Sequence, residues 1–203
     1  MTSHHDTVKE LLAENDSTFA ADAGISLDDT PSPLFELLVL SLLLSTRISS
    51  DIAVAAAREL FRAGYRTPQK MADAKWRDLV DALGRGHYKR YDESTATRLN
   101  ELGARVGDVY RGDLRTLAAE ADGDVGKAKE LVEEFKGIGP TGADIFLREV
   151  QEVWTWARPY FDKKSADEAK KLGLPTDPYE LAHLAPDGKA AALAAALVRK
   201  SLR

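Results

Sequence analysis

The segment from Leu34 to Leu44 constrains the fold more than any other part of the sequence. Six residues follow the i, i+3, i+4, i+7 spacing of one helix face: Leu34, Leu37, Leu38, Ser41, Leu42 and Ser45. Most other residues of the segment are also apolar, so this helix must be covered by neighbours on nearly every side. The segment has about half the length of a membrane span and contains Glu36 and Ser41. It therefore predicts a central, buried helix.

Helical patterns continue through the rest of the chain. Further helices are predicted at 49–63, 67–72, 75–83, 94–109, 114–121, 125–135, 141–154, 165–172 and 187–202, with a short one at 7–14. No segment alternates convincingly as a strand, and no repeat of fixed period is visible. The sequence therefore predicts an all-α protein.

The chain has no cysteine, which excludes several kinds of site at once. Disulfides, cysteine nucleophiles, zinc–thiolate sites and ordinary iron–sulfur clusters all need this residue. The four histidines, His4, His5, His87 and His183, lack metal-ligand spacing. We therefore expect no metal and no cofactor. The first 30 residues are polar, so we expect no signal peptide and a cytoplasmic location.

The net charge of −5 is unevenly distributed. Residues 1–30 contain seven carboxylates and one lysine, so the remainder of the chain is close to neutral. A neutral body can still present a local basic face, and phosphates respond to local charge. Binding to nucleic acid is therefore compatible with the composition.

A tight turn at 136–140 joins two of the predicted helices. Gly137 and Gly139 flank Ile138, so the backbone can adopt positive φ while the isoleucine fills the space between the helices. Pro140 suits the first turn of the following helix. The N–H groups there can hold a phosphate. By itself, the pattern is more typical of a plain helical hairpin than of a phosphate-binding turn.

The turn gains meaning from the sequence that follows it. About 20 residues later comes Ala157-Arg158-Pro159-Tyr160-Phe161-Asp162, with the aspartate at a predicted helix start. A helix-hairpin-helix of the form Leu-x4-Lys-Gly-Ile-Gly-Pro-x-Gly-Ala, then a proline loop and an aspartate, resembles the helix-hairpin-helix–Gly/Pro–Asp superfamily of DNA glycosylases. Endonuclease III belongs to that superfamily. The resemblance covers about residues 31–175.

The resemblance implies an architecture of two helical lobes with a DNA-binding cleft between them. One lobe would be a six-helix bundle at 31–153, carrying the helix-hairpin-helix at about 125–154. The other would comprise 154–203 with the catalytic aspartate loop, joined by the acidic segment 1–30. The implied partner is double-stranded DNA that contains a base lesion or mispair, and the implied reaction is hydrolysis of the N-glycosidic bond of a flipped-out base.

Asp162 is the residue that the resemblance identifies as catalytic. Glycosidic cleavage builds positive charge on the sugar. A fixed carboxylate can stabilise that charge and orient or deprotonate water, and the base must leave the stack to be reached. The alternative is that Asp162 is only the N-cap of the helix that begins near Lys163. The two roles are compatible.

The sequence departs from the family pattern at three places. Thr141 stands where strand-nicking members carry the lysine that forms a Schiff base, so we expect base removal with little or no lyase activity. Lys136, Lys163 and Lys164 are nearby amines and leave weak lyase activity open. No iron–sulfur cluster can form without cysteine. Arg47 replaces the glutamine that fills the hole left by the flipped base.

The loop 86–91 mixes aromatic and basic residues, as a base-stacking wedge with phosphate anchors would. Packing of its tyrosines on the bundle is the alternative. Trp154 and Trp156 are candidates for the base pocket or for the core. The expected DNA-binding set is Lys136, Gly137, Ile138, Gly139, Thr141, Arg47, Tyr88, Lys89, Arg90, Tyr91, Lys163 and Lys164.

Three functional hypotheses follow from the sequence. The first is a monofunctional DNA glycosylase, with the base that it removes left open among uracil or thymine mispairs, oxidised pyrimidines and alkylated purines. The second is a non-catalytic helix-hairpin-helix protein that binds abnormal DNA. The third is a helical protein–protein adaptor.

Overall fold

A computed structural model describes residues 3–203 and confirms the all-α prediction: no strand forms in that range. The α-helices are α1 (His4–Glu14), α2 (Phe19–Asp22), α3 (Pro31–Leu44), α4 (Ser50–Arg62), α5 (Pro68–Asp73), α6 (Trp76–Arg85), α7 (Asp92–Tyr110), α8 (Arg115–Ala121), α9 (Val125–Glu133), α10 (Pro140–Val150), α11 (Lys163–Lys171), α12 (Pro178–Leu184) and α13 (Ala190–Ser201), with a 3₁₀ turn at Thr155–Ala157. No helix in the described part of the chain is long and apolar enough to cross a membrane.

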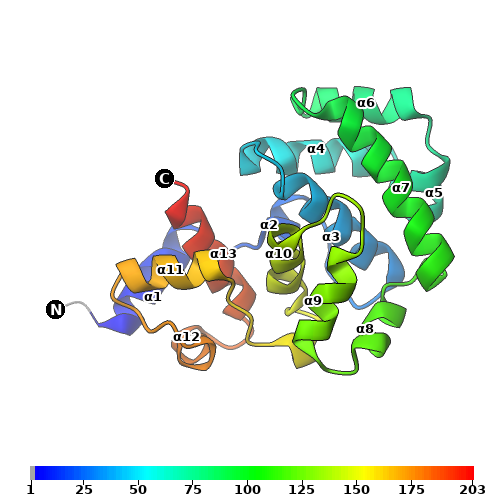
Figure 1. The fold of residues 1–203 in the computed structure, drawn as a ribbon. Coiled ribbons are helices and arrows are strands. Elements are labelled where there is room, and N and C mark those ends of the chain that lie inside the picture. Colours follow the sequence, from blue (N-terminus) through cyan, green and yellow to red (C-terminus); the bar gives the residue numbers. More distant parts are fainter. Residues whose placement is uncertain (1–2) are drawn as a thin grey trace.

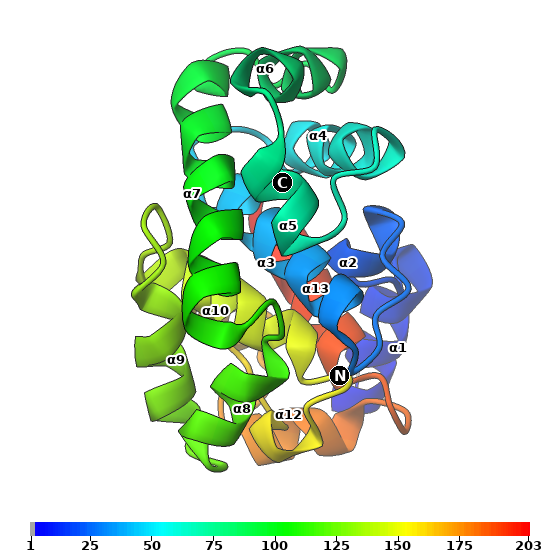
Figure 2. The same cartoon turned by 90° about the vertical axis from the view of Figure 1, so that its right-hand side faces the viewer.

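Helix α3 lies at the centre of the fold, as its composition predicts. Residues 34–43 of this helix are all buried. It packs against α4, α7 and α10, and Figure 2 shows it running through the middle of the molecule beside the long helix α7. Its buried Glu36 is paired with Arg66 at 3.1 Å, which satisfies the one carboxylate in this apolar segment.

The buried side chains form two hydrophobic cores. The larger extends from Phe19 to Ala157 and also takes in Ala195 and Val198. The smaller unites Val8 and Leu11 of α1 with side chains from 161 to 197. Figure 1 shows the corresponding grouping, with α1, α11, α12 and α13 gathered on one side and α4 to α9 on the other. The N-terminal segment is shared, because Phe19, Ala20, Ala23 and Ile25 pack in the larger core.

Several helix boundaries differ from the prediction. Helix α10 ends at Val150, and a turn with the 3₁₀ segment replaces the predicted helical continuation to 154. Phe135 lies in the hairpin turn, just after α9. Helix α12 was not predicted, although Asp177 caps it and Pro178 occupies its first turn, a recognisable start signal.

Candidate active site

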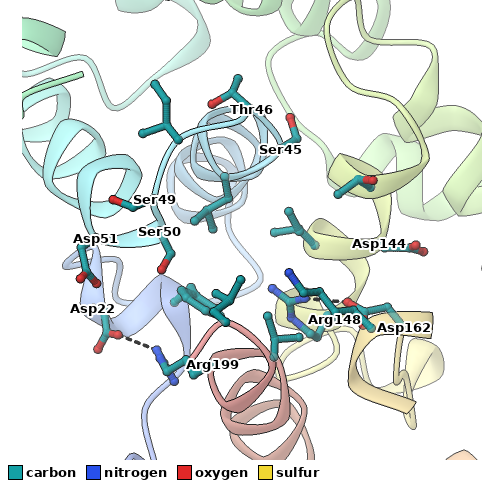
Figure 3. A pocket seen from close by; sticks show the side chains of 18 of the residues that line it. Asp22, Ser45, Thr46, Ser49, Ser50, Asp51, Asp144, Arg148, Asp162 and Arg199 are labelled. Carbon is teal, nitrogen blue, oxygen red and sulfur yellow. Dashed lines mark hydrogen bonds and ion pairs between the residues drawn. The ribbon is translucent and has the colours of Figure 1, made fainter. Parts of the chain in front are cut away.

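A pocket of about 1040 Å³ opens between the two cores. One wall is the end of α3 and the loop to α4, a second is one face of α10, and a third is the start of α11. Residues from α2 and α13 complete it. Figure 3 shows Arg148 and Asp162 on one side of this space and the paired Asp22 and Arg199 on the opposite side. The pocket thus brings together segments that lie far apart in the sequence.

The hairpin delivers α10 to this pocket. Gly137 has φ +94°, and the buried side chain of Ile138 packs against Gly142 on the next helix, where a Cβ would lie 2.8 Å from it. Gly137 and Ile138 therefore do what the sequence predicts, whereas Gly139 has φ −98° and open space where a Cβ would lie. Gly139 is the N-cap and provides no side-chain cap, so the first N–H groups of α10 are left without a capping side chain. Thr141, in that first turn, lines the pocket.

Asp162 lies at the N-cap of α11 and lines the pocket. Its Oδ1 accepts a hydrogen bond from Ser165 N–H at 2.8 Å. Its Oδ2 accepts from Arg148 Nη1 at 2.6 Å, as the dashed line in Figure 3 indicates. Each oxygen therefore has one partner. Since a carboxylate offers about four lone-pair sites, each oxygen can accept one more bond.

Arg148 brings positive charge to the pocket, and the buried Glu149 lies beside it. Both side chains are buried, and Glu149 Oε1 lies 3.7 Å from Arg148 Nε. Glu149 Oε2 accepts from Ala20 N–H at 2.9 Å, which fixes α2 onto α10. Burial raises the pKa of Glu149, and the charge of Arg148 partly offsets this. One buried cation is therefore shared between two carboxylates.

The loop before Asp162 is anchored by polar contacts to α10. Gln151 donates to Tyr160 O at 2.7 Å and accepts from Tyr160 N–H at 2.9 Å. The Tyr160 hydroxyl donates to Asp144, which also pairs with Lys129 at 2.7 Å. Burial and the Asp144 contact raise the pKa of Tyr160, so it remains a donor. These bonds hold the backbone two residues before Asp162.

The facing wall carries a second ion pair. Arg199 of α13 contacts Asp22 at 2.5 Å and donates to Ser17 O at 2.6 Å. Its Cζ lies 4.2 Å from the centroid of the Phe19 ring, and the Cζ of Arg148 lies 5.4 Å from the same centroid. Phe19 is the one aromatic residue among those that line the pocket.

The structure corrects the expected role of Tyr88. Its side chain is fully buried, and its hydroxyl donates to Thr46 Oγ1 at 2.9 Å and lies 3.2 Å from Thr95 Oγ1. It cannot stack on a base in this conformation; instead it braces the pocket loop that carries Thr46. The sequence-based wedge hypothesis is therefore wrong for this residue. Tyr91 is half-buried and packs against the larger core, with Arg90 over its ring at 5.2 Å.

The remaining predicted DNA-binding residues lie on the surface. Arg47, between the pocket residues Thr46 and Ile48, is exposed, as are Lys89 and Arg90. Lys163 and Lys164 line the pocket and are exposed, with Lys163 paired to Asp167. Lys136 is exposed in the hairpin and contacts Glu101 at 3.2 Å. Among these, only Lys163 and Lys164 share the pocket with Asp162.

The tryptophans do not line the pocket. Trp154 is buried, and its ring stacks on that of Trp156 with 5.4 Å between the ring centroids. Its indole Nε1–H donates a hydrogen bond to Asp29 Oδ1 at 3.0 Å. Both therefore serve the larger core.

Sequence reasoning missed Arg148, Gln151, Asp144 and Phe19. A signal for two of them was present, because Thr141, Asp144 and Arg148 follow the i, i+3, i+7 spacing of one helix face and form a polar stripe on α10. Their partners, Tyr160 and Asp162, come from the following loop, and no periodicity links a helix face to a loop.

Comparisons with known proteins find a likeness in structure and none in sequence. No family model matches the chain, and no curated protein matches it. The search of solved structures finds a trapped endonuclease III–DNA covalent intermediate in an estranged-adenine complex, with 16% sequence identity and a TM-score of 0.49. The match covers 97% of this chain and 85% of that chain. The function of this chain has to be inferred from its own residues.

Proposed function

We propose that this protein is a DNA glycosylase that hydrolyses the N-glycosidic bond of a damaged or mispaired base flipped out of duplex DNA. The observation that carries the proposal is the position of Asp162. This carboxylate lies in the pocket between the two cores, and the same pocket reaches the uncapped start of α10. A fixed anion thus lies beside a helix start of the kind that binds phosphate.

The proposed reaction uses the chain's own groups. As the bond between C1′ and the base nitrogen breaks, both electrons go to the base and positive charge develops on the sugar. Asp162 stabilises that charge and accepts a hydrogen bond from the attacking water. The water oxygen bonds to C1′ and its proton ends on the base. The Ser165 and Arg148 contacts hold the carboxylate in place.

Thr141 supports a monofunctional reaction. It lies in the pocket at the position where a Schiff-base lysine would be expected from the family resemblance. A hydroxyl cannot form a Schiff base. Lys163 and Lys164 are the amines that share the pocket, and Lys163 is engaged by Asp167. We therefore propose that the product is an abasic site in an intact strand.

A non-catalytic DNA-binding protein is the second candidate. It is favoured by the two contacts of Asp162, since a carboxylate that caps α11 and pairs with a buried arginine has a sufficient structural role. In that case the pocket would hold an extruded base without cleaving it.

A base-release assay separates these candidates. The protein is incubated with duplexes that each carry one damaged or mispaired base and a label on that strand, and with an undamaged duplex as control. Strand breaks that appear only after hot alkali indicate an abasic product and support the proposal. Breaks without alkali would overturn the monofunctional part. Binding of a lesion duplex without release of any base would favour the second candidate.

A further inference from the structure

The guanidinium of Arg148 has unused donors inside the candidate active site. Its Nη1 is bound to Asp162, and its Nε is buried 3.7 Å from Glu149 Oε1, so the donors left for a ligand are those of the terminal nitrogens. The second terminal nitrogen, Nη2, has no hydrogen bond to any of residues 3–203. The side chain is 3% exposed and lines the pocket. An arginine carries five N–H donors in a rigid planar fork, so this one has capacity for a ligand with acceptor atoms.

The other charged groups of the pocket are largely engaged with one another. Arg199 is paired with Asp22, and Lys163 with Asp167. Asp144 is held by Lys129 and Tyr160. Among the cations that line the pocket, the buried one with donors to spare is therefore Arg148.

We propose that Arg148 determines which base is removed, by donating hydrogen bonds to a carbonyl oxygen of the departing base. This rests on the glycosylase function proposed above. A neutral base that leaves with the electron pair of its glycosidic bond becomes an anion, and the charge spreads onto its carbonyl oxygens. A guanidinium already in place stabilises that charge without reorganisation.

The Asp162–Arg148 pair fits this charge separation. As the bond breaks, the sugar becomes positive and the base negative. The carboxylate is then beside the forming cation and the guanidinium beside the forming anion. Since the two groups are 2.6 Å apart in the resting site, one fixed ion pair complements both ends of the breaking bond.

The same arrangement disfavours bases that already carry a positive charge, such as purines alkylated on a ring nitrogen. Arg148 would repel such a base. Cationic ligands are commonly bound on aromatic faces, but Phe19, the one aromatic lining residue, already contacts two guanidinium groups. The preferred substrates are therefore neutral, carbonyl-bearing bases such as uracil, ring-saturated thymine or 8-oxoguanine.

The first test compares base classes in the parent protein. Single-turnover release is measured from duplexes with one uracil, one ring-saturated thymine or one 8-oxoguanine, and from duplexes with one 7-methylguanine or one 3-methyladenine. Release of a neutral carbonyl-bearing base at least about tenfold faster than either cationic base is expected; 7-methylguanine also has a carbonyl, so this comparison isolates the effect of the charge. Faster release of a cationic base would overturn this inference alone. Release of no base at all would overturn the glycosylase function and this inference with it.

The second test uses Arg148→Gln, which keeps an N–H donor and removes the charge. Loss of one such stabilising donor typically lowers the rate by about 10²–10³-fold, so a loss of that size is expected for the carbonyl-bearing base. Duplex affinity should stay within about threefold, and the rate ratio of cationic to carbonyl-bearing base should rise. Arg148→Lys, which keeps the charge, should retain more activity than the glutamine variant.

Arg66→Gln is the matched control, because Arg66 also pairs with a buried carboxylate and lies over a phenylalanine ring but is outside the pocket. It should release base at the parental rate. If Arg148→Gln lowers release of both base classes equally, Arg148 has only a structural role and the inference fails. If either Arg148 variant does not fold, the comparison of base classes in the parent still decides.

Discussion

Replacing Arg148 by methionine should destabilise the protein strongly. The substitution keeps a long side chain of moderate volume but removes the one cation that Asp162 and Glu149 share. All three side chains are nearly or fully buried. Breaking a buried pair by removing one partner costs about 3–5 kcal/mol, because the remaining charge has no compensation. We expect a loss in that range in the free energy of unfolding, measured by urea denaturation followed by far-UV circular dichroism at about pH 8.

The loss should depend on pH with a defined sign. Burial raises the folded-state pKa of Glu149, and removing Arg148 removes an interaction that lowers it. A carboxyl group with a raised folded pKa contributes its full stability below its unfolded pKa and loses it as pH rises through the folded pKa. The difference between Arg148→Met and the parent should therefore be smaller at about pH 5 than at about pH 8.

Arg66→Met is the control for this prediction. Arg66 pairs with buried Glu36, but its own side chain is 47% exposed and Glu36 keeps a hydrogen bond from Ser32, so the loss should be clearly smaller than that of Arg148→Met. A loss under about 1 kcal/mol for Arg148→Met, or a loss that does not change with pH, would refute this account of the buried pair.

Three further predictions test the pocket and its supports. Glu149→Gln keeps an acceptor for Ala20 N–H and removes a carboxyl whose pKa is raised by burial. In thermal unfolding this variant should be more stable than the parent at about pH 8 but not at about pH 4. The opposite order would contradict the sign of the pKa shift. Tyr88→Phe removes the hydrogen bond to Thr46 and should cost about 1 kcal/mol with unchanged affinity for duplex DNA, whereas a large loss of affinity would restore the stacking role. Thr141→Lys places an amine in the pocket, and borohydride should trap it covalently on lesion DNA; base release without any trapped complex would show that position 141 does not reach C1′.

The helical architecture was readable from the sequence because the signals for it are local. The apolar segment 34–44 has one physical solution, a central helix covered by others, and α3 is that helix. In the turn at 136–140, two glycines and one apolar residue likewise predict a helical hairpin, and Ile138 is buried as predicted. Asp162 was recognisable as a helix cap, and it caps α11.

The chemistry around Asp162 was not readable, because it depends on contacts across separate elements. Arg148 was invisible as its partner, since a residue on a helix and one in the next loop share no spacing rule. Tyr88 was misjudged for a related reason: an aromatic between basic residues is typical of a binding loop, and only the packed fold shows its ring buried against Thr46 and Thr95. The short α2 escaped notice because four residues give too little periodicity.

Comparison of Asp162→Asn with Asp177→Asn tests the central claim most directly. Both aspartates cap helices, Asp162 on α11 and Asp177 on α12, and only Asp162 lines the pocket. Asparagine caps about as well as aspartate, so both variants should fold and bind lesion duplex with near-parental affinity. Single-turnover base release should fall by about 10²–10⁴-fold for Asp162→Asn and stay parental for Asp177→Asn. Parental release by both variants would contradict the account and leave Asp162 as a helix cap.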